Sequence, residues 1–304
     1  MPDDPGLDPG LHSGLLEFAL AAARAAGDVL LEHFEGELTV STKSSDIDLV
    51  TSADRAAEAT LTERITRAHP SHWILAEESG RLTGDADVAD PRPPPGVLQW
   101  VIDPLDGTTN FTHRFPHFSV SLALVDHEGP LLGVVHDPTR EETFYAVRGR
   151  GAFLDSARAR ARNGRPQPLR VTPTRALRLA LVATGFAYTR ATTPTNNLLE
   201  FNRVVPQVRC IRRAGSAALD LAYVAAGRLD AYWEYHLQPW DVAAGALLVQ
   251  EAGGELTRID GGRWDLRHGD LVAAGPTLAP VLQAELAGAR TTSGTCPQGH
   301  APAR

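Results

Sequence analysis

The sequence is poor in cysteine and contains no long hydrophobic run. Cys210 and Cys296 are the only cysteines among its 304 residues. Two cysteines exclude a disulfide framework and a zinc site built from cysteines, and they fit a reducing cytoplasm. No apolar run approaches the roughly 18 residues of a membrane-spanning helix. Residues 1–10 are acidic and rich in proline and glycine, unlike a signal peptide. We therefore expect a cytoplasmic protein that does not enter a membrane.

Lysine is almost absent as well. Of the 29 lysine and arginine residues, only Lys43 is a lysine. GC-rich codon usage explains such a bias, but an ammonium is a compact point charge and a guanidinium a planar fork. Lys43 is therefore a candidate for a site that needs the smaller cation. The 29 basic residues stand against 37 acidic ones, a net charge of −8. This balance argues against bulk affinity for nucleic acid.

Apart from these absences, the composition is that of an ordinary globular protein, with 43% hydrophobic and 22% charged residues. The length predicts two domains. We expect an N-terminal α+β domain over residues 11–155 and a C-terminal α/β domain over residues 170–288. An exposed, arginine-rich connection over residues 155–170 would join them. The tails, residues 1–10 and 289–304, are expected to be disordered.

Hydrophobic periodicity and turn signals outline the elements. Helices are expected over residues 15–34, 52–68, 197–205, 216–226, 242–252 and 278–286. Strands are expected over residues 38–40, 73–76, 97–102, 119–125, 133–136, 142–147, 179–183, 208–211, 231–234, 255–258 and 271–274. Residues 43–48 and the proline-rich residues 81–96 are expected to be loops, and Cys210 is expected in the core.

Acidic residues stand where apolar strands stop or helices begin. The most specific case is Asp103-Pro104-Leu105-Asp106, in which two carboxylates and the Leu105 carbonyl can face one point. Hard divalent cations such as Mg²⁺ prefer oxygen ligands of this kind. Gly107 and Thr108 then lead into a helix, whose free N–H groups can hold a phosphate. One short segment thus offers metal ligands and a phosphate cradle side by side.

Taken alone, such a segment is more often a set of helix caps and turn formers. Three other acidic positions change that interpretation: Asp54, Glu77 with its neighbour Glu78, and Asp241. Glu77 and Asp241 have no basic partner nearby in the sequence. Clustering such carboxylates without compensation is costly, and bound cations remove that cost. The sequence therefore predicts a metal site.

Several segments resemble the signature segments of the inositol monophosphatase family. They are residues 103–111 (DPLDGTTNF), 240–245 (WDVAAG), 75–79 (LAEES), 48–54 (DLVTSAD) and 215–234 (GSAALDLAYVAAGRLDAYWE). They occur in family order, and the resemblance covers roughly residues 13–288. It implies a layered α/β/α/β/α sandwich, usually dimeric, with Mg²⁺-dependent and lithium-sensitive phosphomonoesterase activity.

The resemblance also implies roles for individual residues. Glu77, Asp103 and the Leu105 carbonyl would bind a first Mg²⁺, and Asp103, Asp106 and Asp241 a second. A third, weaker ion would rely on Glu77. Asp54 and Thr108 would act on the attacking water, with Glu77 also in the catalytic set, and the N–H groups of Gly107 and Thr108 would bind the phosphate. The alcohol would contact Gly215, Ser216, Ala217, Glu234 and Asp241. Arg212 would be a substrate-contacting arginine, and Lys43 a loop lysine near the metals.

The expected function is hydrolysis of myo-inositol monophosphate by a metal-activated water. Glu234 favours a polyol, because a carboxylate can accept hydrogen bonds from two neighbouring hydroxyls. Alternatives on the same scaffold are fructose-1,6-bisphosphatase, histidinol-phosphatase and 3′-phosphoadenosine-5′-phosphate phosphatase. A non-catalytic regulatory or RNA-associated role is a remote alternative, since the chain keeps every expected carboxylate and Thr108. The expected partners are a small phosphorylated polyol and a second copy of the chain, not a nucleic acid.

Overall fold

The computed structural model describes residues 9–36, 40–42, 49–83 and 90–291. Lys43 and its expected loop, residues 43–48, lie outside these residues. No helix among the described residues is both long enough and apolar enough to cross a membrane.

An eight-stranded sheet forms the first half of the molecule, in the order β10-β9-β8-β7-β6-β5-β3-β4. Its pairs are antiparallel except β3 with β5. Its strands are β3 (Trp73–Ala76), β4 (Gly80–Thr83), β5 (Gln99–Asp106), β6 (Ser119–Asp126), β7 (Gly129–Asp137), β8 (Glu142–Val147), β9 (Ala152–Asp155) and β10 (Gln167–Pro168). A small hairpin of β1 (Val40–Thr42) and β2 (Leu49–Thr51) precedes it.

A five-stranded sheet forms the second half, in the order β12-β11-β13-β15-β14. Its strands are β11 (Leu181–Thr184), β12 (Cys210–Arg212), β13 (Ala231–Glu234), β14 (Glu255–Thr257) and β15 (Leu271–Ala274). The first three pair in parallel, and β15 and β14 are antiparallel to their neighbours. A short 3₁₀ turn, η1 (Leu177–Leu179), leads into β11.

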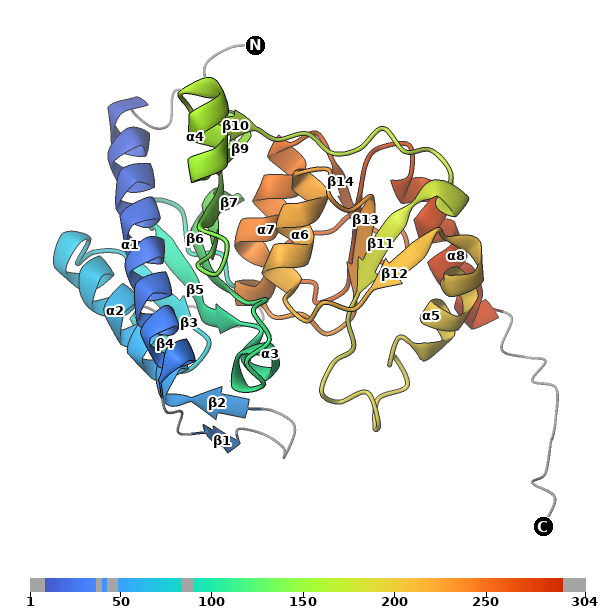
Figure 1. Cartoon of the computed structure of the whole chain (residues 1–304), viewed down its shortest axis with the longest axis horizontal. Helices are drawn as coiled ribbons and strands as arrows, with labels where there is room; N and C mark the ends of the chain where they lie inside the picture. The colour runs from blue at the N-terminus through green and yellow to red at the C-terminus, as the bar shows by residue number, and fades with distance from the viewer. Residues whose placement is uncertain (1–8, 37–39, 43–48, 84–89, 292–304) are drawn as a thin grey trace.

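Three helical layers alternate with the two sheets (Figure 1). Helices α1 (Pro9–Glu35) and α2 (Ser52–Ala68) cover the outer face of the first sheet. Helices α6 (Ala217–Ala225) and α7 (Pro239–Glu251) lie between the sheets. Helices α5 (Leu198–Val204) and α8 (Ala279–Thr291) cover the outer face of the second sheet. The expected α/β/α/β/α sandwich is therefore confirmed.

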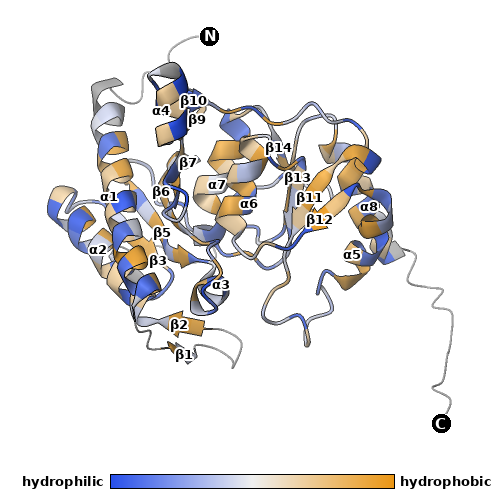
Figure 2. Cartoon of the chain, in the orientation of Figure 1, coloured by the Kyte–Doolittle hydropathy of each residue, from blue (hydrophilic) through white to orange (hydrophobic). Residues whose placement is uncertain are grey.

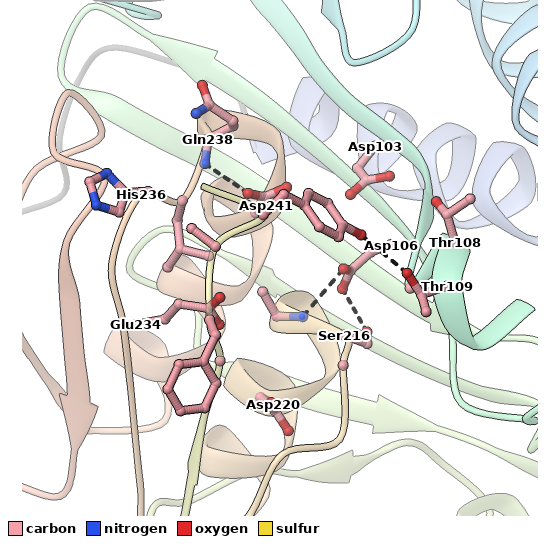
Figure 3. A pocket seen from close by; sticks show the side chains of 18 of the residues that line it. Asp103, Asp106, Thr108, Thr109, Ser216, Asp220, Glu234, His236, Gln238 and Asp241 are labelled. Atoms are coloured by element: carbon pink, nitrogen blue, oxygen red, sulfur yellow. Dashed lines mark hydrogen bonds between the residues drawn. The ribbon is translucent and has the colours of Figure 1, made fainter. Parts of the chain in front are cut away.

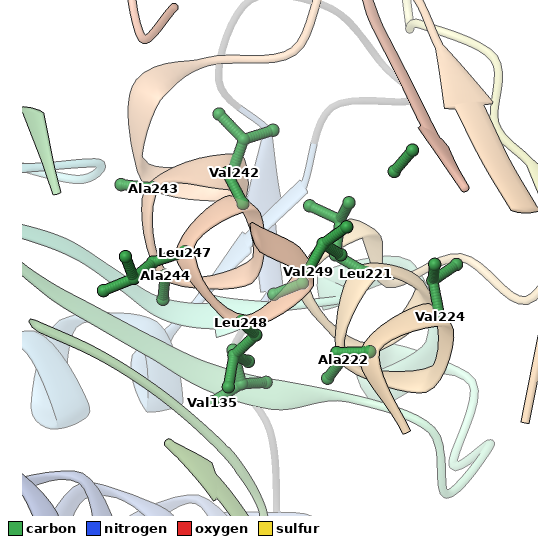
Figure 4. Packing of buried hydrophobic residues seen from close by; sticks show 14 of the residues in the cluster. Val135, Leu221, Ala222, Val224, Val242, Ala243, Ala244, Leu247, Leu248 and Val249 are labelled. Carbon is green, nitrogen blue, oxygen red and sulfur yellow. The ribbon is translucent and has the colours of Figure 1, made fainter. Parts of the chain in front are cut away.

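The central helices are mostly apolar, because each packs against a sheet and the other helix (Figure 2). Val135 of the first sheet packs near Leu248 of α7, and Leu221 of α6 packs near Val249 (Figure 4). Close approach requires glycine here, since a Cβ at Gly133 would lie 2.8 Å from the Ala244 carbonyl oxygen. This packing fixes where the first turn of α7 meets the first sheet.

Several expectations from the sequence need correction. Residues 155–170 are not a plain loop, because they contain helix α4 (Ala157–Asn163) and strand β10. The Ser156 side chain caps α4 and Gly164 ends it in the left-handed conformation. Residues 81–96, expected to be a loop, include most of strand β4. Cys210 is exposed rather than buried, because it lies on the edge strand β12.

The expected tails also overlap the first and last helices. Helix α1 already includes residues 9–10. Helix α8 runs five residues past the expected end at Leu286, to Thr291, and it buries Ala289.

Candidate active site

The segment that the sequence predicts to bind metal lies at an irregularity of strand β5. Asp103 pairs with Ser121 and Asp106 with Ser119, so the register shifts between the two acids. The Leu105 N–H donates to Asp103 Oδ1 at 3.0 Å. Gly107 follows with φ 103°, and a Cβ there would lie 3.1 Å from the His117 carbonyl oxygen. The turn therefore needs glycine, and it leads the chain directly into the short helix α3 (Thr108–Thr112).

Thr108 and Asp54 are hydrogen-bonded although 54 residues separate them. The Thr108 hydroxyl lies 3.2 Å from Asp54 Oδ1 and 3.1 Å from the Leu105 carbonyl oxygen. The second oxygen of Asp54 accepts from Thr51, from its N–H at 2.8 Å and its hydroxyl at 2.6 Å. This is the capping box of α2. The start of α2 thus holds Asp54 rigidly beside Thr108.

Asp106 is held by the N-terminus of α6. The Ser216 hydroxyl donates to Asp106 Oδ2 at 2.6 Å (Figure 3). The Ala218 N–H donates to the same oxygen at 2.8 Å. The Ala217 N–H donates to Oδ1 at 3.3 Å. A carboxylate from the first sheet therefore closes the start of a central helix, where the helix dipole favours a negative charge.

Asp241 enters the site from the first turn of α7. Its Oδ2 accepts from the Gln238 N–H at 2.7 Å. The Ser121 hydroxyl of β6 donates to the Trp240 carbonyl oxygen at 3.0 Å, which ties this turn to the first sheet. Glu77 follows β3, and its N–H donates to the Ile102 carbonyl oxygen at 3.1 Å. Adjacent strands and the central layer thus bring the acids together.

The electrostatics of these carboxylates show strong mutual repulsion. Burial raises the pKa of Asp103 well above its ordinary value, and the charges of Glu77, Asp106 and Asp241 raise it further. Burial, with the charges of Glu77 and Asp106, likewise raises the pKa of Asp241. Burial raises the pKa of Asp106 to about 6, although the hydrogen bonds from α6 oppose this.

The donor set fits divalent cations. Oxygen ligands with excess negative charge are what Mg²⁺ and similar ions prefer. Among the described residues, no three histidine, cysteine or acidic side chains form a ready-made chelate. The acids instead border one cavity, which leaves room for water molecules to complete the coordination of an ion.

That cavity has a volume of about 860 Å³. Glu77, Asp103, Asp106 and Asp241 line one part of it. Glu234, from the end of β13, lines another part, and the Tyr232 hydroxyl donates to its Oε2 at 2.6 Å. Burial raises the pKa of Glu234 to about 7. The cavity therefore combines a cluster of four acids with a separate carboxyl group, Glu234, that can accept hydrogen bonds.

A loop that follows β11, residues 185–190, forms a wall of the cavity. Asn197 fastens it by donating to the Gly185 carbonyl oxygen and to the Thr184 hydroxyl, both at 2.7 Å. Thr109 Oγ1 lies 3.3 Å from the Tyr188 hydroxyl, which links the loop to α3. The wall is thus attached to both halves of the molecule.

Most of the residues expected at the site line the cavity. They are Glu77, Asp103, Leu105, Asp106, Gly107, Thr108, Gly215, Ser216, Ala217, Glu234 and Asp241. Asp54 lies behind Thr108. Arg212 does not line the cavity; its guanidinium lies 2.9 Å from Cys210 Sγ, and the adjacent Arg213 lines the cavity instead. Lys43 lies outside the described residues.

The structure also adds residues that sequence reasoning missed. Asp220, on the next turn of α6 after Ser216, lines the cavity with 3% of its surface exposed. Its Oδ1 has no hydrogen-bond partner among the residues that the structure describes. Asn110 donates to the His117 and Ala214 carbonyl oxygens, at 2.7 and 2.9 Å, and so joins the two halves beside the site. Asn110 lies in the segment 103–111 and Asp220 in the segment 215–234. Their place in these family-like segments is the sequence feature that could have identified them.

Comparison with known proteins agrees with this geometry. The model of the inositol monophosphatase family matches residues 12–294. The protein named Nus factor SuhB of Pseudomonas aeruginosa is 46% identical over 263 residues, which cover 85% of this chain and 90% of that protein. Its namesake in Escherichia coli K12 is 42% identical over 275 residues, covering 90% and 95%.

Solved structures agree as well. The inositol monophosphatase of Anabaena is 38% identical, with a TM-score of 0.77 over 93% of this chain and 99% of that chain. The extragenic suppressor protein suhB of Bartonella henselae is 36% identical, with a TM-score of 0.78 over 90% and 98%.

Proposed function

The chain belongs to the inositol monophosphatase family, whose members are generally metal-dependent phosphatases. From that premise we propose that it hydrolyses myo-inositol monophosphate to myo-inositol and phosphate. One observation supports this most: the acids Glu77, Asp103, Asp106 and Asp241 border one cavity beside the Asp54–Thr108 hydrogen bond. Carboxylates gathered in this way repel one another, and bound cations relieve that repulsion.

We propose Mg²⁺ as the ion. Glu77, Asp103 and the Leu105 carbonyl would hold one ion, and Asp103, Asp106 and Asp241 a second. A third would rely on Glu77. When bound, divalent cations make a water molecule more acidic and stabilise charge on the phosphoryl oxygens.

Thr108 and Asp54 supply the path for a proton. The Thr108 hydroxyl donates to Asp54 Oδ1, which leaves its oxygen lone pairs free to accept from the attacking water. As that water attacks phosphorus, the bond between phosphorus and the alcohol oxygen breaks. The proton of the water passes to Thr108 while the Thr108 proton passes to Asp54, and the departing alcohol oxygen takes up a proton from solvent. Asp54 cannot rotate away, because Thr51 holds its other oxygen. Proton transfer by positioned groups typically contributes about 10²- to 10⁴-fold.

The other end of the cavity suits a polyhydroxylated alcohol. Glu234 offers carboxylate oxygens, with Gly215, Ser216 and Ala217 nearby at the start of α6. We propose that Glu234 accepts hydrogen bonds from substrate hydroxyls. The N–H groups of Gly107 and Thr108, where α3 begins, would bind the phosphate oxygens.

A substrate panel tests the proposal. Purified protein is assayed with myo-inositol 1-phosphate, fructose 1,6-bisphosphate, histidinol phosphate and 3′-phosphoadenosine 5′-phosphate across a Mg²⁺ titration. The highest kcat/KM is expected for the inositol phosphate, with no turnover in a metal chelator. A preference of about tenfold or more for another substrate, about 1.4 kcal/mol, would replace this assignment while leaving the phosphatase class intact.

A role beside catalysis is the second candidate, because the similar curated proteins carry the name Nus factor SuhB. An Asp103→Asn variant separates the two roles: it should lose turnover and keep any function that depends only on the folded surface.

A further inference from the structure

The arginines of this chain are not spread evenly over its surface. Residues 150–178, here called the arginine-rich segment, contain eight arginines and a single acid, Asp155. All eight arginines are exposed. This concentration is unexpected in a chain whose net charge is −8. GC-rich codon usage explains arginine in place of lysine, but it does not explain the lack of acids.

Asp155 is already neutralised. It binds Arg160 at 2.5 Å and also Arg24 of α1 at 2.6 Å. Within the described residues, the other seven arginines of the segment form no ion pair. They are Arg150, Arg158, Arg162, Arg165, Arg170, Arg175 and Arg178. Two more acids close to the segment are engaged with the backbone: Glu251 accepts from Gly149 and Gly151, and Asp230 accepts from Leu181. The eight arginines therefore outnumber the three acids identified within or beside the segment, which are Asp155, Glu251 and Asp230.

The backbone of the segment is fixed. Leu169 is buried, and its N–H donates to the Ala152 carbonyl oxygen at 2.8 Å. The Val171 N–H donates to the Ala252 carbonyl oxygen at 3.1 Å, and the Thr172 hydroxyl donates to Asp230 at 2.6 Å. After α4 and β10 the chain crosses to the second sheet along one edge of the molecule, at the top of Figure 1. The arginines therefore stand on a rigid scaffold that runs from one sheet toward the other.

The chemistry of this surface selects one class of partner. Arginine is also enriched in protein interfaces, but there it accompanies a buried core that contains aromatic and other apolar side chains. Membrane surfaces likewise require apolar groups that can insert. The segment exposes neither kind, since Leu177 and Leu169 point inward and Phe153 stacks on Tyr145. A polyphosphate backbone needs only positive charge. Without exposed aromatic rings to stack on unpaired bases, single strands have no advantage.

We propose that the arginine-rich segment binds the phosphate backbone of a nucleic-acid double helix, without sequence preference. The site is separate from the phosphatase cavity, because none of its arginines lines that cavity. Net charge argued against bulk affinity for nucleic acid, and that argument does not apply to a locally segregated surface.

Fluorescence anisotropy with a labelled duplex of about 20 base pairs, as RNA and as DNA, tests the proposal at about 50 to 200 mM salt. The test variant is the triple R158Q/R162Q/R165Q on and beside α4. The matched control is R55Q/R64Q/R67Q, which removes three exposed arginines from α2. Both variants change the net charge equally, and both should keep the wild-type kcat/KM and melting temperature.

We expect the test variant to weaken duplex binding at low salt by about tenfold or more and to flatten the slope of log K against log salt by about 2.7, or 0.9 for each lost contact. The control should stay within about twofold of wild type. Equal losses in the two variants, no binding by wild type at the lowest salt, or a wild-type preference for phosphatidylglycerol vesicles over the duplex would each overturn the proposal. Because phosphatase activity is measured in parallel, failure of one assignment does not depend on the other.

Discussion

At the scale of single residues, the proposed metal site consists of carboxylates that repel one another, and bound cations would relieve that repulsion. Asp103→Asn and Asp241→Asn each remove one negative charge from the cavity. We expect each variant to lose more than about tenfold in kcat, equivalent to 1.4 kcal/mol of barrier. Without added metal each should melt at a higher temperature than wild type, because the repulsion that raises the pKa of both groups is relieved.

Steady-state kinetics and thermal melts in a chelator measure both effects. Glu63→Gln, an exposed position on α2, is the control with the same change of charge. A variant with an unchanged kcat would contradict the assignment of these residues to the metals.

Thr108 and Asp54 should behave as one unit. Thr108→Ala is expected to lower kcat by about 10² with little effect on the Mg²⁺ dependence, and Asp54→Asn should be equally damaging. The double variant should be no worse than either single variant, because both interrupt the same proton path. Thr112→Ala on the same helix α3 is the control, since Thr112 does not line the cavity. Additive losses would show that the two residues act separately.

At the scale of elements, strand β7 holds a histidine under helix α1. His136 is buried, its Nδ1 lies 3.0 Å from the Thr143 hydroxyl, and a Cβ at Gly27 would lie 2.6 Å from its ring. Burial lowers the pKa of His136 from 6.5 to about 4, with a further contribution from Arg24. Between these two values the unfolded chain binds more protons than the folded chain. The contribution to the free energy of unfolding is therefore complete above pH 6.5 and is lost as the pH falls toward 4.

Urea unfolding measured between pH 4 and 6.5 tests whether the free energy of unfolding rises with pH. His136→Gln should flatten the rise of unfolding free energy with pH by up to about 3 kcal/mol, at about 1.4 kcal/mol for each pKa unit. His127→Gln, at an exposed position in the turn between β6 and β7, should leave the rise unchanged. Comparing variants with wild type cancels the carboxylates of the site, whose raised pKa values act in the opposite direction. A parallel curve for His136→Gln would refute the prediction.

The elements that could be predicted from the sequence are those with a strong local signal. The helix over residues 52–68 and the strands over residues 73–76, 142–147, 231–234 and 271–274 agree with the structure, because capping residues and apolar runs define them locally. Strand β4 and helix α4 were missed. Strand β4 (GRLT) and helix α4 (ARARARN) are short and lack a run or period of large apolar residues, and they depend on pairing with β3 and on the Ser156 cap.

In the site, too, the features with a local sequence signal could be predicted, and those that depend on tertiary contacts could not. The acids were recognisable because they occupy short contiguous motifs. The wall formed by residues 185–190 was not, since it depends on Asn197 and on contacts that only the folded chain creates.

At the scale of the whole molecule, large apolar side chains remain exposed in both halves of the chain. Phe115 follows α3 with 54% of its surface exposed, and Leu198 and Leu199 begin α5 with 49% and 44% exposed. We expect these exposed side chains to pack against a second copy of the chain. Light scattering after size exclusion should give about twice the 32.6 kDa of one chain. Phe115→Asp combined with Leu198→Asp should yield monomers, and a monomeric wild type would contradict the expectation.

The division of the acids between the two halves of the chain has a consequence for biosynthesis. Glu77, Asp103 and Asp106 leave the ribosome early, whereas Asp241 and the α6 N-terminus that grips Asp106 come from the second half. The first sheet alone would carry three carboxylates that repel one another. It would lack both Asp241 and the hydrogen bonds that α6 donates to Asp106. We therefore expect a nascent or truncated chain to have no phosphatase activity until the central helices have packed against the first sheet. Phosphate release would then require the whole chain to be folded.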